Sequence, residues 1–156
     1  MTEFIRSTPP GFHYRPTVLS HGWCALPPFR CDDSGTLGRI QKLRSGDIID
    51  FNVREGEIGL IISTEAAITQ GQQVEINAVI ARCLSFEQDL STFYKLVDEH
   101  PGYQWITRIG AGRMLRSPTV WEDLAKTLLT TNTTWAMTTS MVSRLNTLGE
   151  AAADAS

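Results

Sequence analysis

The sequence predicts an α+β protein, with an antiparallel β-sheet near residues 37–84 followed by an incomplete helical subdomain. Between residues 37 and 84 the apolar residues follow strand periodicity, and turn residues separate the runs without intervening helices. After residue 84 the spacing becomes that of amphipathic helices. The predicted units are therefore residues 1–88, an antiparallel β domain with an N-terminal loop region, and residues 89–156, a set of helices.

Composition excludes several classes of protein. The 156 residues are 42% hydrophobic and 20% charged, which suits one soluble domain and argues against disorder. No run reaches the roughly 18 apolar residues of a membrane span, so we expect no membrane partner. The N-terminus lacks the apolar core of a signal peptide, and we expect a cytoplasmic location, nucleoid-associated if bacterial. The three cysteines cannot all pair and lack zinc-site spacing, so we expect reduced thiols, no metal and no cofactor.

The N-terminal part leads into the predicted sheet. Residues 11–30 are rich in proline, glycine and aromatic residues, so we expect extended or turned chain there. The four predicted strand runs that follow are residues 37–43, 47–54, 57–64 and 72–84. The second and third form a hairpin around the turn at residues 54–56, with one buried face. The fourth run is either a strand or, from Ala78 onward, a helix, because its apolar residues do not alternate cleanly with polar ones.

Helix signals then continue to the end of the chain. An amphipathic run begins at Asp89 and stops at Pro101, and a short helix over residues 103–109 follows. Ser117 supplies an N-cap and Pro118 a first-turn proline, so the next helix should begin at Pro118. Its apolar stripe comprises Leu124, Leu128 and Leu129.

Five polar residues, Thr130 to Thr134, interrupt this helical region before a last helix from Trp135 to Gly149. One interpretation is simple capping, since Thr and Asn side chains bond free backbone groups at helix junctions. The other is a polar tip that meets phosphates or base edges. Residues 101–147 carry five basic and two acidic side chains, whereas residues 46–99 carry three and ten. The net charge of −3 therefore does not exclude a local contact with a polyanion.

Two weaker patterns have simple explanations. The sequence Gly110-Ala111-Gly112 has neither a preceding strand nor a third glycine, so a helix end is favoured over a dinucleotide site. His21 lies near Ser20 and Cys24 in the sequence, and a base paired with either side chain is one interpretation. A loop histidine bonded to the backbone is the other, and it is the one we favour.

The helical region also resembles a known family. The segments GRMLRSP (112–118), EDL (122–124), LTTNTTW (129–135) and MVSRL (141–145) resemble the opening of the helical core of certain DNA glycosylases. These are the 8-oxoguanine and 3-methyladenine types, base-excision repair enzymes of the helix-hairpin-helix superfamily. Upstream, residues 19–23 and 26–29 resemble the start of their antiparallel, TBP-like β domain. The resemblance extends from about Phe12 to Gly149.

The resemblance implies roles for particular residues. Asn132 matches the asparagine that enters the duplex, fills the space of the extruded base and bonds the orphaned partner. Gly22 lies near a loop glycine that approaches the damaged base, which makes it a base-pocket candidate. Met137 stands where the 8-oxoguanine enzymes have an arginine that reads cytosine, so the substrate is expected to be nearer to alkylated bases. The implied DNA-binding residues are Asn132, Thr131, Thr133, Arg113 and Arg116.

The family's Leu-Pro-Gly-x-Gly hairpin and later catalytic aspartate do not occur in these residues. We therefore expect a DNA-binding and damage-recognition N-terminal portion of a bacterial-type glycosylase, not catalytic alone, with no catalytic residue of its own. Its partner would be double-stranded DNA with a damaged base. Two alternatives are a non-catalytic nucleic-acid-binding module and a protein-interaction or assembly domain, for instance a homodimer through exposed helical surface.

Overall fold

A computed structural model describes residues 1–149 of the chain. Residues 150–156, the end of the predicted 89–156 unit, lie outside the described residues. One antiparallel sheet of five strands, in the order β1-β5-β4-β3-β2, dominates the first half and is followed by helices, which confirms the predicted α+β class. The strands are β1 (Thr2–Arg6), β2 (Phe29–Cys31), β3 (Leu37–Lys42), β4 (Ile48–Gly56) and β5 (Gly59–Thr64).

The β4–β5 hairpin is the predicted one. Phe51 and Val53 of β4 are buried on the same face as Leu60 and Ile62 of β5, and Val53 lies opposite Ile62 in the register. This strict alternation gives the sheet one apolar face, against which the core packs.

An edge strand was not predicted from the sequence. β1 pairs antiparallel with β5, so that Phe4 lies opposite Ile62. The Thr2 hydroxyl adds a bond to the carbonyl of Ala66 at 3.0 Å. Gly59, with a φ of 148°, lies so close to β1 that an added Cβ would collide with the carbonyl of Arg6.

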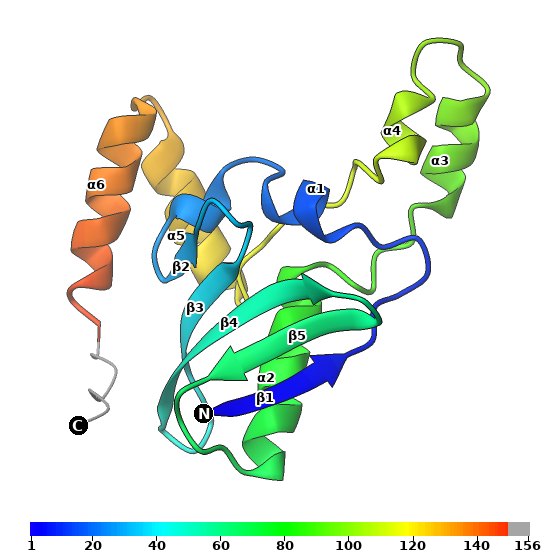
Figure 1. Cartoon of the computed structure of the whole chain (residues 1–156). Helices are drawn as coiled ribbons and strands as arrows, with labels where there is room; N and C mark the ends of the chain where they lie inside the picture. Colours follow the sequence, from blue (N-terminus) through cyan, green and yellow to red (C-terminus); the bar gives the residue numbers. More distant parts are fainter. Residues whose placement is uncertain (150–156) are drawn as a thin grey trace.

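A helix, α2 (Gln70–Cys83), occupies the fourth predicted strand run, and the strand interpretation of that run was wrong. Thr69 caps the helix through a capping box with Gln72, which fixes its start well before Ala78. Its buried residues, Ile76, Ile80 and Cys83, recur at helical spacing. Figure 1 shows α2 lying across one face of the sheet, where these side chains join the core.

The N-terminal segment is more regular than predicted. It contains the short helix α1 (Tyr14–Val18) and the 3-10 turn η1 (Trp23–Ala25) before β2. Pro16 fits α1 because the first-turn amides of a helix have no partner inside it. The buried Tyr14 hydroxyl donates to the carbonyl of Val53 at 2.6 Å and accepts from the amide of Leu37 at 3.2 Å, which ties α1 to the sheet.

The remaining helices form two hairpins on different sides of the sheet (Figure 1). The first hairpin is α3 (Ser91–Asp98) with α4 (Trp105–Arg108), and the second is α5 (Val120–Thr130) with α6 (Trp135–Asn146). All four helices lie in regions predicted to be helical. Within residues 1–149, no helix is both long and apolar enough to cross a bilayer.

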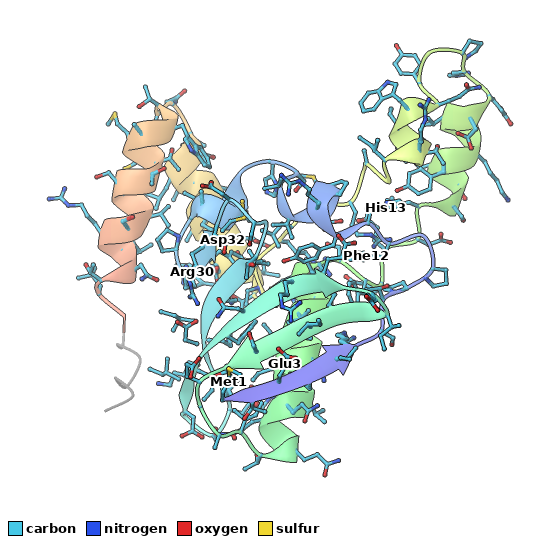
Figure 2. All side chains as sticks on the ribbon, in the orientation of Figure 1. Met1, Glu3, Phe12, His13, Arg30 and Asp32 are labelled. Atoms are coloured by element: carbon cyan, nitrogen blue, oxygen red, sulfur yellow. The ribbon has the colours of Figure 1, made fainter. Side chains whose placement is uncertain are left out.

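The N-terminal loop joins the sheet to the first hairpin. Figure 2 shows Phe12 and His13 between the sheet and the α3–α4 hairpin. The Phe12 ring meets that of Phe86 edge-on at 4.8 Å, and the His13 ring lies where a side chain at Gly110 would be.

Two details of α5 differ from the prediction. The helix begins at Val120, two residues after Pro118, because Thr119 is the N-cap and accepts the amide of Glu122 at 3.2 Å. Of the predicted apolar stripe, Leu124 and Leu128 are exposed, while Lys126 is only 3% exposed. The face of α5 that meets the sheet is therefore charged.

Candidate nucleic-acid interface

The turn between α5 and α6 presents one asparagine to solvent. Asn132 is exposed and has a φ of 54°, a left-handed conformation that Asn tolerates better than most residues. Within the described residues, its side-chain amide has no hydrogen-bond partner, in contrast to the threonines on either side of it. Both the donor and the acceptor of this amide are therefore available to a ligand.

The threonines around Asn132 build the turn. Thr131 donates to the carbonyl of Leu128 at 2.7 Å, and Thr133 donates to that of Leu129 at 3.0 Å. These bonds satisfy carbonyls at the end of α5, and the Thr134 hydroxyl caps α6. The capping interpretation therefore describes the threonines, while the side chain of Asn132 makes no hydrogen bond to any residue of the described part of the chain, 1–149.

Gly22, the base-pocket candidate, lies beside α6, the second helix of this hairpin. Gly22 has a φ of 87° and is the N-cap of η1. A Cβ there would lie 3.2 Å from Cζ2 and 3.4 Å from Cη2 of Trp135, the first residue of α6. The fold thus brings Gly22 close to the residue that follows the Thr130–Thr134 turn.

The two candidate arginines make internal contacts. Arg113 is buried, and its guanidinium donates to the carbonyl of Ser85 and lies 5.8 Å from the ring of Phe12. Arg116 donates from Nε to the carbonyl of Arg82 at 2.8 Å and forms an ion pair with Glu87. These contacts join residues 113–116 to the end of α2, and they leave Arg113 only 7% exposed.

A buried group of charges holds α5 against the sheet. Arg39 of β3 binds both oxygens of Glu122, at 3.0 and 2.7 Å, and Lys126 donates to the same carboxylate at 2.7 Å. Both cations also lie over the ring of Phe29, at 4.5 Å for Arg39 and 4.7 Å for Lys126. We call Arg39, Glu122 and Lys126 the charge cluster.

The charge cluster shifts the protonation of its members. Burial raises the pKa of Glu122, but the hydrogen bonds and charges of Arg39 and Lys126 outweigh it, so that the pKa lies below its usual value. Burial lowers the pKa of Lys126, and the single carboxylate, shared between two cations, does not fully offset this. The cluster therefore depends on an ionised Glu122.

His21 does contact Ser20, as one interpretation of the sequence required. Its Nδ1 lies 2.9 Å from the Ser20 hydroxyl, which also accepts the amide of Leu115 at 3.1 Å. Burial lowers the pKa of His21, and the positive charge of Lys126 adds to that effect while Asp123 opposes it. A neutral imidazole can accept from Ser20, and the bond from Leu115 to the same hydroxyl ties the loop to the segment that precedes α5.

Comparisons with known proteins support the fold. No family model matches the sequence, and neither does any curated protein. Among solved structures, a 3-methyladenine DNA glycosylase from Archaeoglobus fulgidus matches with a TM-score of 0.65 and 13% sequence identity. The match covers 92% of this chain and 49% of that one, so this chain spans about half the length of the glycosylase. The fold is therefore like that of a DNA glycosylase, and at this identity the likeness concerns the fold alone.

Two features of this region were missed in the sequence. The pairing of Arg39 with Glu122 links residues 83 positions apart, and no local pattern marks it. The spacing of Glu122 and Lys126, four residues apart, was the available signal for a charged face on α5. Trp135 next to Gly22 is likewise a long-range contact.

Proposed function

We propose that this chain is the DNA-binding and damage-recognition part of a base-excision repair DNA glycosylase, and that it does not cleave the glycosidic bond alone. The observation that carries the proposal is the exposed amide of Asn132, which bonds no residue between 1 and 149, in a turn whose threonines all make internal hydrogen bonds. Such an amide can bond the Watson–Crick edge of a base that has lost its partner.

The likeness of the fold to that of a DNA glycosylase supports this proposal, because a polar turn on such a fold could contact DNA. Arg113 and Arg116 make internal contacts, so in this proposal they position the α5–α6 hairpin. Phosphate contacts then come from the exposed Arg144 of α6 and from backbone amides at the start of that helix.

The test is fluorescence anisotropy with two labelled duplexes of one sequence, one intact and one with a stable abasic-site analogue. We expect the abasic duplex to bind about tenfold more tightly, the equivalent of about 1.4 kcal/mol. Asn132→Gly should abolish the preference. Glycine is the cleanest replacement because it removes the amide and accepts the φ of 54° without strain.

A matched control is Asn146→Ala, at the exposed C-terminal end of α6, which should keep the preference for the abasic duplex. Equal binding of both duplexes by the wild-type chain would favour the non-catalytic nucleic-acid module. Release of an alkylated base by the purified 156-residue chain would contradict the claim that it is not catalytic alone.

A second candidate function is protein–protein assembly, and the solvent-exposed stripe of α5 favours it. Val120, Trp121, Leu124 and Leu128 lie along one side of this helix and are all exposed. In this reading the chain self-associates, and light scattering should show a dimer that Leu124→Glu converts to a monomer. A wild-type monomer at every concentration would remove this candidate.

A further inference from the structure

Trp135 is an aromatic side chain placed beside the turn that carries Asn132. It is the first residue of α6, three positions after Asn132, and its side chain is 48% exposed. The six-membered part of the indole lies next to Gly22, 3.2 Å from where a Cβ of that residue would be, and about half of the side chain remains open to solvent. A large apolar surface is thus kept exposed at the edge of a polar turn.

Gly22 fixes the position of this ring. A Cβ at Gly22 would be in tight contact with the indole, and the φ of 87° disfavours any other residue. Without a side chain, the loop before η1 reaches the ring and holds it on one side. The loop therefore limits the ring to a small range of positions while leaving part of it accessible.

The surroundings of Trp135 distinguish it from Trp121, the other exposed tryptophan of the same hairpin. Trp121 is 76% exposed and lies at the far end of α5, within the apolar stripe. The residues that precede Trp135 are instead polar, Thr133 and Thr134 among them. A single aromatic surface beside hydrogen-bonding groups suits a ligand that is both flat and polar, which is the chemistry of a nucleobase.

We propose that Trp135, held by Gly22, is a stacking surface for an unpaired nucleobase next to Asn132. This inference rests on the proposed function and adds a contact to it: Asn132 bonds the edge of a base, and Trp135 covers the face of one. Base–aromatic stacking of this kind changes affinity by roughly 5- to 150-fold per base in nucleic-acid-binding proteins.

The probes are two labelled duplexes that differ in one group. One has a single bulged adenine, and the other has an abasic residue at the bulge, so that only the first offers a base to stack. We expect the wild-type chain to bind the bulged adenine about tenfold more tightly. Trp135→Ala should remove the difference, and Trp135→Phe, which keeps a smaller ring, should retain part of it.

Trp121→Ala is the matched control, because it removes a more exposed indole from the same hairpin, and it should leave the difference unchanged. Circular dichroism of each variant shows whether the hairpin remains folded. If Trp135→Ala unfolds the hairpin, the Trp135→Phe result decides. Gly22→Ala is a second variant, expected to weaken binding of the bulged adenine by displacing the ring.

The outcomes separate this inference from the proposed function. Equal binding of the two bulged duplexes by the wild-type chain, or a difference that survives in Trp135→Ala, overturns the stacking role. If Asn132→Gly still loses its preference for abasic DNA in that case, the proposed function stands. A wild-type chain that binds no duplex overturns both.

Discussion

Replacing Glu122 by glutamine is expected to destabilise the fold by about 3 kcal/mol. The carboxylate is the shared partner of Arg39 and Lys126, which are 4% and 3% exposed. Glutamine keeps the size of the side chain but removes the carboxylate that the two buried cations share. Breaking a buried ion pair costs about 3–5 kcal/mol, and we expect the lower end because Glu122 itself is 19% exposed.

The assay is urea unfolding at pH 7, followed by tryptophan fluorescence. The control is Asp50→Asn, which breaks the surface pair with Arg30, whose partners are 46% and 47% exposed, and should cost at most about 1 kcal/mol. The double variant Glu122→Gln, Lys126→Met should recover part of the loss, because it removes one orphaned cation. A loss for Glu122→Gln no greater than that for Asp50→Asn would refute the reasoning that the charge cluster holds α5.

Three further predictions concern stability. The pKa of Glu122 lies below its ordinary value of 4.5, so the contribution of its charge to the free energy of unfolding is present above pH 4.5 and is lost as the pH falls through the lower folded-state pKa. Urea unfolding at decreasing pH should show this loss of stability in the wild type and a smaller loss in Glu122→Gln. Gly59→Ala should lower the free energy of unfolding by about 2 kcal/mol or more, because the Cβ of the new alanine would collide with the carbonyl of Arg6. Thermal unfolding measures this, and an unchanged melting temperature would contradict the collision. Thr138→Val should lower the free energy of unfolding by about 1–2 kcal/mol, since the buried Thr138 hydroxyl donates to the carbonyl of Leu129 at 3.1 Å. An unchanged free energy in urea unfolding would contradict a stabilising role for this bond between α5 and α6.

The sheet hairpin and the helical half were predictable because their signals are local. The alternation of Phe51 and Val53 with polar neighbours indicates which face is buried, and a short turn fixes the antiparallel return. The chain break at Pro101 and the polar run at Thr130–Thr134 likewise mark helix ends by their own chemistry.

Two of the differences, β1 and the buried face of α5, have physical reasons that lie far away in the chain. β1 has only five residues, and its partner strand β5 lies more than fifty positions later, so no short-range pattern identifies it. In α5 the leucine stripe was the stronger periodic signal, yet the cation of Lys126 is buried because Glu122 pairs with it and the ring of Phe29, far away in the chain, lies 4.7 Å from its Nζ. Long-range compensation of this kind is not visible in a helical period.

At the candidate site, the position of the turn could be predicted from the sequence, and the structure shows which of its side chains are hydrogen-bonded within the protein. Local capping rules account for the threonines, and they also explain why Asn132 takes the left-handed position of the turn. The placement of Trp135 on Gly22 depends on how the N-terminal loop meets the last helix, which the sequence alone does not reveal.

The pairing of β1 with β5 affects the order in which the chain folds during synthesis. β1 is synthesised before the other strands of the sheet, but its partner strand ends only at Thr64, and the anchor of the Thr2 hydroxyl is Ala66. Until those residues are made, β1 is an unpaired strand that must wait for the β4–β5 hairpin to form. The strand of the sheet that is translated first therefore cannot be the first to be ordered.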